Sequence, residues 1–230
     1  IRDLCYRRAQ VVVCQTADAA KSFPAGIRKK SVVISNPLEP QEEPYTGERE
    51  KRIVAVGRLS AQKNHKMLLR AFASFAKSRG DYILELYGQG ELETELRAMA
   101  EELGMRRRVM FRGFSSHVLA DIRTAAMYVL SSDYEGISNS MLEAMALGLP
   151  VIATDCPIGG SRMYIRDGVN GLLVPVGDEE ALARAMERLA DEPAFGESLG
   201  REAVKLRGEL TTAKIADKFL ALAASEWRQR

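Results

Sequence analysis

Short apolar runs alternate with amphipathic segments from Arg52 onward, and no other feature of the sequence constrains the fold as strongly. The runs are short and largely apolar on both sides, as strands are when both faces of a parallel sheet are buried. They cover residues 53–56, 82–87, 109–111, 127–130, 151–153 and 172–174. Strand–helix alternation repeated this often predicts an α/β fold with a doubly wound parallel sheet.

The segments between these runs carry the end signals of helices. Asn64 and Asp178 precede apolar stripes and are expected to be N-caps, whose side chains accept hydrogen bonds from the first-turn N–H groups. Gly104 and Gly148 follow the ends of two stripes, where glycine readily takes the left-handed conformation that ends a helix. His65, directly after Asn64, is expected to be exposed in a first turn.

The sequence divides into four parts. Residues 36–50 hold prolines and a glycine among charged residues and are predicted to be a linker. Residues 1–35 carry two strand-like runs around a short helix and are predicted to be a remnant of a preceding N-terminal domain. Because the chain opens at Ile1 in the middle of this pattern, we expect a piece of a longer protein. Residues 51–210 are the predicted principal domain, and residues 211–230 a C-terminal helix.

The composition excludes several classes of protein. Hydrophobic residues make up 46% and charged residues 28%, as in a folded domain with a real core. The 33 basic and 31 acidic residues balance too evenly for binding to nucleic acid through charge alone. Cys5, Cys14 and Cys156 lack metal-ligand spacing, and the last two adjoin strand-like runs. Buried thiols are therefore expected, which favours a cytoplasmic location.

The first candidate site is the segment GRLSAQKN (57–64), which follows the first strand of the principal domain. Ligands of open α/β sheets bind at this end of the strands. Gly57 lets the backbone approach a ligand closely, and Arg58 and Lys63 can bracket a diphosphate. A solvated loop with two surface cations is the alternative.

The second candidate site is the segment EGISNSMLE (135–143), with one carboxylate in a loop and one on the following helix. The loop carboxylate can accept hydrogen bonds from sugar hydroxyls, and the helical one can hold a ribose diol. The N–H groups at the start of the helix suit an anion. A capping cluster with a solvated second carboxylate is the alternative. The predicted site residues are Glu135, Gly136, Ile137, Ser138, Asn139, Ser140, Met141 and Glu143.

Two weaker signals follow the next two strands. Gly88 opens a Gly-x-Gly turn, but the dinucleotide pattern needs a third glycine where Glu93 stands, so a tight turn near a nucleotide explains it equally well. Arg112 and Phe114 flank Gly113, where backbone groups and the aromatic ring can meet a nucleobase. A plain turn with a core aromatic is the alternative.

The sequence offers no metal site and no phosphate loop. His65 and His117 are far apart and lack the spacing of metal ligands. There is no Asp-x-Asp to support a metal-bridged diphosphate, and no Gly-x-x-x-x-Gly-Lys-Ser/Thr. We therefore expect neither a metal nor a cofactor.

Taken in this order, the motifs resemble family 4 of the retaining glycosyltransferases, which have the two-domain GT-B fold. The resemblance runs from Arg52 almost to the end of the chain, and only the ordered set is specific. Met163 departs from it, since family members often carry a Glu there, which puts local donor contacts or loop packing in doubt. The matching segments are GRL and QKN (57–64), GQG (88–90), FRG (111–113), the Glu135/Glu143 pair and DGVNGLLV (167–174).

The resemblance implies that the principal domain is the Rossmann-like, C-terminal donor-binding half of the enzyme. Arg58 and Lys63 would bind the donor diphosphate and stabilise the leaving charge, and Glu135 would contact the sugar, so these three are the predicted catalytic residues. Glu143 would hold the ribose. Sugar transfer would proceed with retention and without a metal, from a nucleotide-sugar donor.

The partners follow from the same resemblance. A UDP-sugar is favoured as donor and a GDP-sugar is the alternative, with a glycan or lipid-linked acceptor bound partly by the missing N-terminal domain. Peripheral association of the full-length protein with the inner face of the membrane stays open. Two other functions also stay open, namely a sugar-nucleotide epimerase of GT-B architecture and a non-catalytic nucleotide-sugar-binding module. We expect the isolated chain to be inactive.

Overall fold

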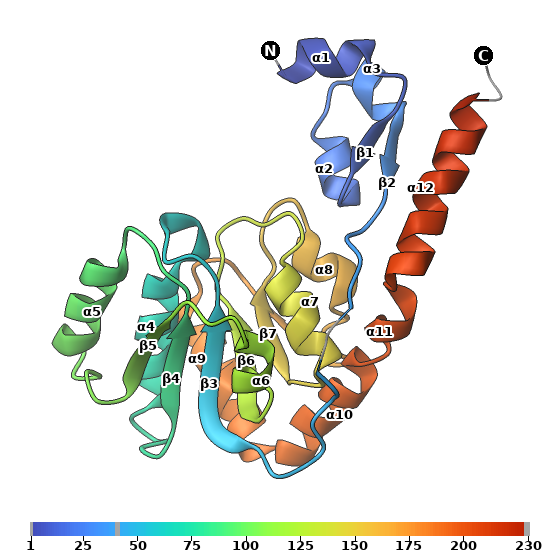
Figure 1. Ribbon diagram of the computed structural model, residues 1–230. Helices are drawn as coiled ribbons and strands as arrows, with labels where there is room; N and C mark the ends of the chain where they lie inside the picture. Colours follow the sequence, from blue (N-terminus) through green and yellow to red (C-terminus); the bar gives the residue numbers. More distant parts are fainter. Residues whose placement is uncertain (1, 40–41, 228–230) are drawn as a thin grey trace.

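Six parallel strands form the central sheet, which confirms the predicted α/β fold (Figure 1). The computed structural model describes residues 2–39 and 42–227. All six strands lie where the sequence predicts them, with ends displaced by at most three residues. In spatial order they are β5 (Val109–Gly113), β4 (Ile83–Tyr87), β3 (Glu50–Val56), β6 (Ala125–Leu130), β7 (Val151–Thr154) and β8 (Leu172–Val174).

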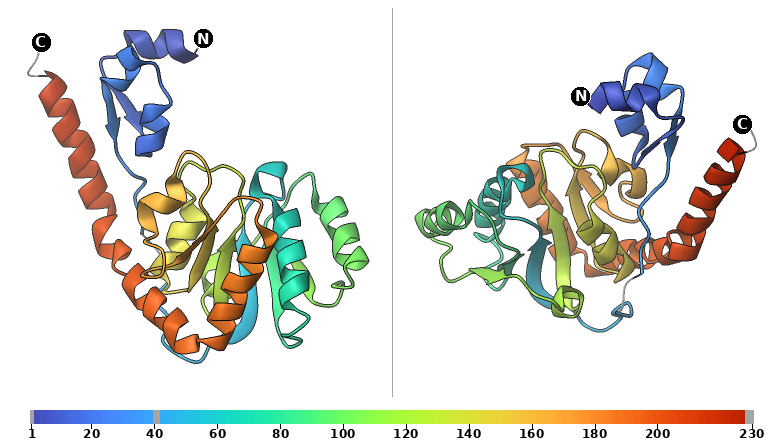
Figure 2. Two further views of the ribbon diagram at one scale, coloured as in Figure 1. Left: turned by 180° about the vertical axis from the view of Figure 1, so that it is seen from behind. Right: turned by 45° about the horizontal axis from the view of Figure 1, so that its top comes forward.

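Helices cover the sheet from both sides, as Figure 1 and the reverse view in Figure 2 show. In β3, Ile53 and Ala55 join the apolar cluster beneath one set of helices, whereas Val54 joins the cluster beneath the other. This two-sided burial explains why the strands are continuously apolar. One set comprises α4 (His65–Phe75), α5 (Glu93–Glu102) and α9 (Glu179–Asp191), and the other α6 (Val118–Ile122), α7 (Asn139–Ala146) and α8 (Gly160–Tyr164).

The predicted helix signals are confirmed. The side chain of Asn64 accepts a hydrogen bond from the Met67 N–H at 3.1 Å, and that of Asp178 accepts one from Ala181 at 2.8 Å. Gly104 and Gly148 both have φ of 72°, the left-handed conformation that favours glycine. Local sequence therefore determines where these helices begin and end.

The prediction that His65 is exposed is wrong, because only 3% of this residue is accessible. The loop after β6 lies against the start of α4, where Asn64 Nδ2 donates to Asp133 Oδ1 at 2.7 Å. Burial, followed by the charge of Lys63, lowers the pKa of His65 to about 4. The imidazole is therefore neutral at physiological pH, and its Nδ1 has no partner within the described residues.

A small unit precedes the main domain. It has a two-stranded parallel sheet and a core of Val12, Cys14 and Ile27. The thiols of Cys14 and Cys156 are free and buried, as predicted. The elements of this unit are α1 (Arg2–Arg8), β1 (Val12–Cys14), α2 (Ala17–Lys21), α3 (Ala25–Arg28) and β2 (Ser31–Val33).

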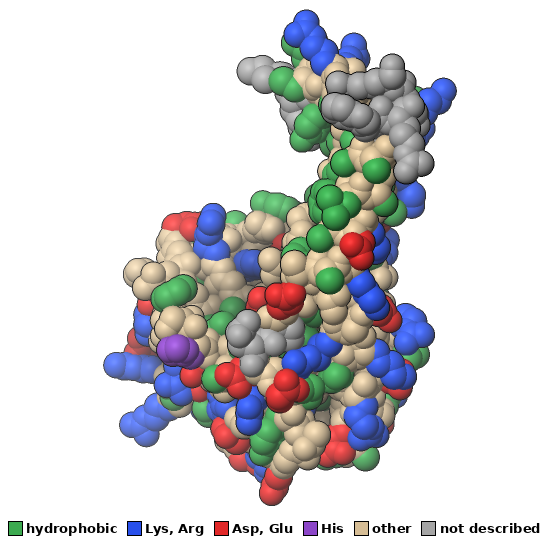
Figure 3. Space-filling view, turned by 45° about the vertical axis from the view of Figure 1, so that its right-hand side comes forward, with side chains coloured by type: hydrophobic (Ala, Val, Ile, Leu, Met, Phe, Trp, Pro, Cys, Tyr) green, Lys and Arg blue, Asp and Glu red, His purple; other side chains and the backbone are tan. Residues whose placement is uncertain are grey.

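The chain ends in α10 (Pro193–Ala203), α11 (Leu206–Glu209) and α12 (Thr212–Trp227), and α12 projects from the main domain on the same side as the N-terminal unit (Figure 1). Phe219 and Leu220 of α12 are 47% and 67% exposed. Figure 3 shows apolar side chains gathered on this projecting part, and charges of both signs mixed over the body. Within the described residues no helix combines the length and apolar character needed to cross a membrane.

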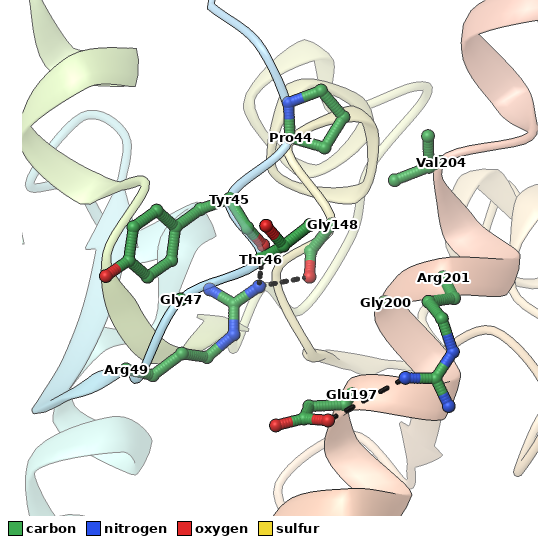
Figure 4. Close-up of a pocket in the computed structure, with 10 residues that line it drawn as sticks. All are labelled: Pro44, Tyr45, Thr46, Gly47, Arg49, Gly148, Glu197, Gly200, Arg201 and Val204. Carbon is green, nitrogen blue, oxygen red and sulfur yellow. Dashed lines mark hydrogen bonds and ion pairs between the residues drawn. The ribbon is translucent and has the colours of Figure 1, made fainter.

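Arg49 fixes the second half of the predicted linker to the main domain. Its guanidinium donates to the backbone oxygens of Tyr45, Arg123, Ala125 and Gly148, at 2.6 to 3.4 Å. Arg49, Tyr45 and Gly148 also line part of a cavity of about 230 Å³ (Figure 4). Because Arg49 and Gly148 precede β3 and β7, this cavity lies at the amino ends of the strands, away from the edge where α/β sheets bind ligands.

Candidate functional site

The strand order reverses between β3 and β6, which lie side by side in parallel while β4 and β7 lie on their outer sides. Such a switch point leaves a crevice at the carboxyl ends of the two strands, where open α/β sheets bind ligands. The loops that leave β3 and β6 lead into the two candidate sites, 57–64 and 135–143. The topology therefore brings both predicted segments to one crevice.

Hydrogen bonds join these two loops. Ser131 Oγ donates to the backbone oxygen of Lys63 at 2.8 Å, and the Asp133 N–H donates to that of Gln62 at 2.9 Å. The Gln62 amide donates in turn to the backbone oxygen of Tyr134 at 2.9 Å. The position of Lys63 is thus set by the loop that carries Glu135.

Lys63 and Glu135 form an ion pair that links the two loops. Lys63 Nζ lies 2.5 Å from Glu135 Oε1, and the two side chains are 16% and 9% exposed. Ser132 Oγ donates to the same carboxylate oxygen at 2.9 Å. Gly57 makes room for the lysine, since a Cβ there would lie 2.9 Å from Lys63 Cε. Glycine at position 57 therefore leaves space for the end of the Lys63 side chain.

The start of α7 is built for polar contacts. Ser138 is its N-cap, with Oγ accepting from the Met141 N–H at 3.4 Å. Ser140 Oγ donates to the backbone oxygen of Val56 at 3.1 Å and lies 2.9 Å from the Tyr128 hydroxyl. This helix start is thereby anchored to the end of β3.

The electrostatics place both predicted carboxylates around Tyr128. Burial raises the pKa of the fully buried Tyr128 hydroxyl, and the negative charges of Glu135 and Glu143 raise it further. Burial also raises the pKa of the half-buried Glu143 carboxyl. The pKa of Cys156 is raised by burial and then by the charge of Glu135. Glu135 and Glu143 therefore both lie close enough to Tyr128 to act on its hydroxyl, and Glu135 also acts on Cys156.

The N-terminal unit borders the same loop. Gln15 donates to Asn36 Oδ1, and Asn36 Nδ2 donates to Asn139 Oδ1, each at 2.8 Å. A Cβ at Gly136 would meet Gln15 Oε1 at 3.1 Å. These three side-chain amides form a chain of hydrogen bonds from the N-terminal unit to Asn139, the first residue of α7.

Gly160 allows the loop after β7 to press against the Glu135 loop. A Cβ at this position would lie 1.5 Å from the backbone oxygen of Gly136, so no other residue fits without a backbone shift. Thr16 Oγ1 of the N-terminal unit donates to the backbone oxygen of Ile158 at 2.6 Å and holds the same loop from outside. Gly160 is thus a packing requirement of the site.

Arg58 is exposed, and its side chain makes no hydrogen bond or ion pair with any described residue. It follows Gly57, whose N–H donates to the Tyr87 backbone oxygen at 2.9 Å, so its backbone is held at the end of β3. The guanidinium of Arg58 is therefore free to take an anion, in contrast to the ammonium of Lys63.

Gly88 and Gly90 are explained by close packing of two loops. Cβ atoms at these positions would lie 2.0 Å from the backbone oxygen of Gly57 and 2.3 Å from that of Leu59. Gly88 also has φ of 130°, which side chains rarely allow. The Gly-x-Gly segment is thus a tight turn that supports the first candidate site.

The side chains of Arg112 and Phe114 have different surroundings in the structure. The guanidinium of Arg112 bonds to the buried carboxylate of Glu85, with Nε 2.9 Å from Oε1. It lines a surface cavity of about 430 Å³ with Arg52 and Asp121, and its contact with a base stays a prediction. Phe114 is 78% exposed, which rules out the core aromatic considered as its alternative.

Two residues of the second segment face inward. Met141 is fully buried in the cluster beneath α7, and Ile137 packs against that cluster. Their side chains support the loop, and the side chain of Met141 offers nothing to a ligand. The sequence predicted a contact through the backbone N–H groups at this helix start, and in the structure the Met141 N–H donates to Ser138 Oγ of the N-cap. Its contact with an anion stays a prediction.

Sequence reasoning missed Ser132, Tyr128 and Asn36 as neighbours of the site. Ser132 precedes Glu135 by three residues, so its proximity was a readable signal. In the sequence, nothing distinguishes Tyr128 from the apolar residues of its strand. Asn36 bonds to Asn139, which lies 103 residues away in the chain, so the sequence offers no signal for that contact. Within the described residues, no group of three or more His, Cys, Asp and Glu side chains could hold a metal ion.

Comparison with known families decides the affiliation. The family described as glycosyl transferases group 1 matches residues 39–206, which include both candidate loops. The chain belongs to this family. Its parallel sheet and helices have the Rossmann-like fold that is also found in GT-B glycosyltransferase structures.

Named relatives agree with this affiliation. The chain is 30% identical over 240 residues to the lipopolysaccharide core biosynthesis glycosyltransferase LpsE of Rhizobium meliloti, covering 96% of this chain and 66% of LpsE. It is 31% identical over 170 residues to N-acetylgalactosamine-N,N'-diacetylbacillosaminyl-diphospho-undecaprenol 4-alpha-N-acetylgalactosaminyltransferase of Campylobacter jejuni, covering 74% of this chain and 44% of that enzyme. The chain thus spans about half to two thirds of their length.

Solved structures share the fold. Anabaena Alr3699/HepE in complex with UDP has a TM-score of 0.87 at 20% identity, over 97% of this chain and 66% of HepE. TarM of S. aureus, solved with UDP and a glycosylated glycerol, has a TM-score of 0.86 at 23% identity, over 94% of this chain and 44% of TarM. At these identities the likeness establishes architecture.

Proposed function

We propose that this chain is the donor-binding half of a retaining glycosyltransferase that moves a sugar from a nucleotide-sugar to a glycan or lipid-linked acceptor. One observation carries the proposal. The Lys63–Glu135 pair lies at the switch point of the sheet, and the capped start of α7 follows the glutamate. Arg58, which pairs with none of the residues that the structure describes, lies on the same loop as the lysine. A pyrophosphate needs the cations and the helix start, and a sugar needs the carboxylate.

UDP is the favoured nucleotide, with GDP as the alternative. HepE and TarM were both solved with UDP, and they share the architecture of this chain. The exposed Phe114 after β5 offers a stacking surface for a base. Glu143 would hold the ribose, and its half-buried carboxyl favours a hydrogen-bonded partner over bulk water.

The proposed reaction needs no metal. Arg58 and Lys63 supply the positive charge that stabilises the leaving diphosphate, and preorganised charges of this kind commonly contribute about 10²–10³ in rate each. The acceptor would bind largely on an N-terminal domain for which residues 1–35 are the adjoining part. Relatives named for lipopolysaccharide and undecaprenol-linked glycans support the acceptor class, and with it a place at the inner face of the membrane.

A thermal-denaturation panel tests the proposal. The chain is heated with UDP-, GDP- and ADP-sugars in the presence of EDTA, since a ligand that binds only the native state raises its stability by about 2.7 kcal/mol at a concentration 100 times Kd. The midpoint should rise most with a UDP-sugar and should do so without magnesium. An unchanged midpoint with every nucleotide-sugar would refute the proposal.

A further inference from the structure

The carboxylate of Glu135 is used asymmetrically. Its Oε1 takes both internal donors, Lys63 Nζ at 2.5 Å and Ser132 Oγ at 2.9 Å. Its Oε2 makes no hydrogen bond within the described residues, and it is not one of the buried atoms that lack a partner. That oxygen is therefore the one that keeps some contact with solvent.

Ser132 is a rigid donor. It is fully buried, and its backbone oxygen accepts a hydrogen bond from Thr154 Oγ1 of β7 at 2.5 Å. Thr154 is itself fully buried and also donates toward the Leu130 backbone oxygen at 3.4 Å. Ser132, two residues beyond the end of β6, is thus held in place by a hydrogen bond from the central sheet.

Lys63 alone would not fix the orientation of the carboxylate. An ammonium is a compact charge with three rotatable donors, so it can pair with either oxygen of a carboxylate as the latter turns. A hydroxyl held by the sheet removes this freedom, because only one oxygen can stay within its reach. Both internal donors together determine which oxygen faces the crevice.

We propose that Ser132 is a positioning residue, which turns Glu135 so that Oε2 alone is presented to a hydroxyl group of the donor sugar. This inference rests on the proposed function and deepens it. It assigns to a buried serine the task of keeping the sugar-binding oxygen in place, while Lys63 and Arg58 remain with the diphosphate. Ser132 touches no ligand in this arrangement and acts only through Glu135.

The test is a double-mutant cycle read out by calorimetry. Kd is measured for UDP and for the tightest binder among UDP-glucose, UDP-galactose and UDP-N-acetylglucosamine. The proteins are the wild type, Ser132→Ala, Glu135→Ala and the double variant. Ser198→Ala is the control, since its hydroxyl bonds to the Phe195 backbone oxygen in α10, away from the crevice.

Ser132→Ala should raise Kd for the UDP-sugar about tenfold, as the loss of a hydrogen bond to a charged group does, and change Kd for UDP less than twofold. In the Glu135→Ala background the same substitution should add nothing, because its effect passes through the carboxylate. Ser132→Cys keeps a side chain of similar size with a weak donor and gives the same comparison should the alanine variant not fold.

Two results would overturn the inference. Equal losses for UDP and the UDP-sugar would show that Ser132 serves only the structure of the loop. Effects of Ser132→Ala and Glu135→Ala that add would show that the serine does not act through the glutamate. A wild-type chain that binds UDP but gains nothing from the sugar contradicts this inference, whereas one that binds no nucleotide contradicts the proposed function itself.

Discussion

Replacing Gly160 by alanine should disable the site without touching any functional side chain. The added Cβ would lie 1.5 Å from the backbone oxygen of Gly136 and 2.7 Å from its carbonyl carbon. Real Cβ atoms essentially never approach closer than 3.0 Å, so the two backbones must separate by at least a further 1.5 Å. Because Gly136 follows Glu135 directly, that movement must displace the carboxylate from Lys63.

The cost in stability has two parts. One part is favourable, because alanine within a helix stabilises the fold by about 0.5–1 kcal/mol relative to glycine, and Gly160 is the first residue of α8. Overpacking a well-packed site costs about 1–3 kcal/mol, and here the obstacle is backbone that cannot rotate away. We expect Gly160→Ala to lower the free energy of unfolding by about 1–2 kcal/mol and to raise Kd for a UDP-sugar at least tenfold.

Gly208→Ala in α11 is the matched control. A Cβ there meets nothing within 4 Å, so the substitution should be neutral or stabilise by up to about 1 kcal/mol. Urea unfolding gives both free energies, and calorimetry gives both dissociation constants. If Gly160→Ala were as stable as Gly208→Ala and bound the UDP-sugar like the wild type, the reasoning from close backbone packing would fail.

Three further predictions concern stability. Asn64→Ala should lower the free energy of unfolding by about 1–2 kcal/mol in urea, through the lost cap and a left-handed φ of 43°, and Asn64→Gly should cost less; equal losses would contradict the backbone argument. Because the pKa of His65 is lowered in the folded chain, protonation of His65 favours the unfolded chain, and the free energy of unfolding should fall by up to about 3 kcal/mol from pH 6.5 towards 4. The fall should be smaller in His65→Gln, and identical pH profiles of the two proteins would contradict this assignment. Arg49→Met should lower the free energy of unfolding by at least about 2 kcal/mol, because four backbone oxygens lose a charged donor. Arg201→Met in the same cavity should change stability little, and comparable losses of the two variants in a thermal melt would refute the role of Arg49.

The elements of the fold were predictable because their signals are local. Strands buried on both faces must be apolar throughout, and the caps at Asn64 and Asp178 depend only on residues three positions apart. The location of the site at the carboxyl ends of the strands follows from the parallel fold class. These statements need no knowledge of which strands are neighbours.

The sequence placed Lys63 and Glu135 at one donor site, but their direct ion pair and the burial of His65 could not be predicted, because both depend on strand order. Lys63 and Glu135 are 72 residues apart, and they meet because β6 pairs with β3 instead of following β5 at the edge of the sheet. The same ordering brings the loop after β6 over the start of α4 and buries His65. Periodicity reports the faces of an element, but not which loop will cover its end.

The predicted base contacts at Arg112 and Phe114 also depend on neighbours that the sequence does not reveal. A turn with an arginine and an aromatic after β5 was visible in the sequence. That Arg112 turns to Glu85 while Phe114 stays exposed depends on a buried carboxylate on the neighbouring strand. The sequence pattern supplied these candidate residues, and the structure shows how each of their side chains is placed.

The central claim is that Arg58 and Lys63 together hold a nucleoside diphosphate without a metal, and titration of UDP in the presence of EDTA tests it most directly. The wild type should show saturable binding, and Arg58→Ala/Lys63→Ala should raise Kd at least about 100-fold, since each lost charged hydrogen bond costs about 1.5–3 kcal/mol. Lys66→Ala/Arg70→Ala on α4 removes the same charge from exposed ion pairs and should leave Kd unchanged. Binding that survives the first double substitution, or that appears only after magnesium is added, would contradict the account.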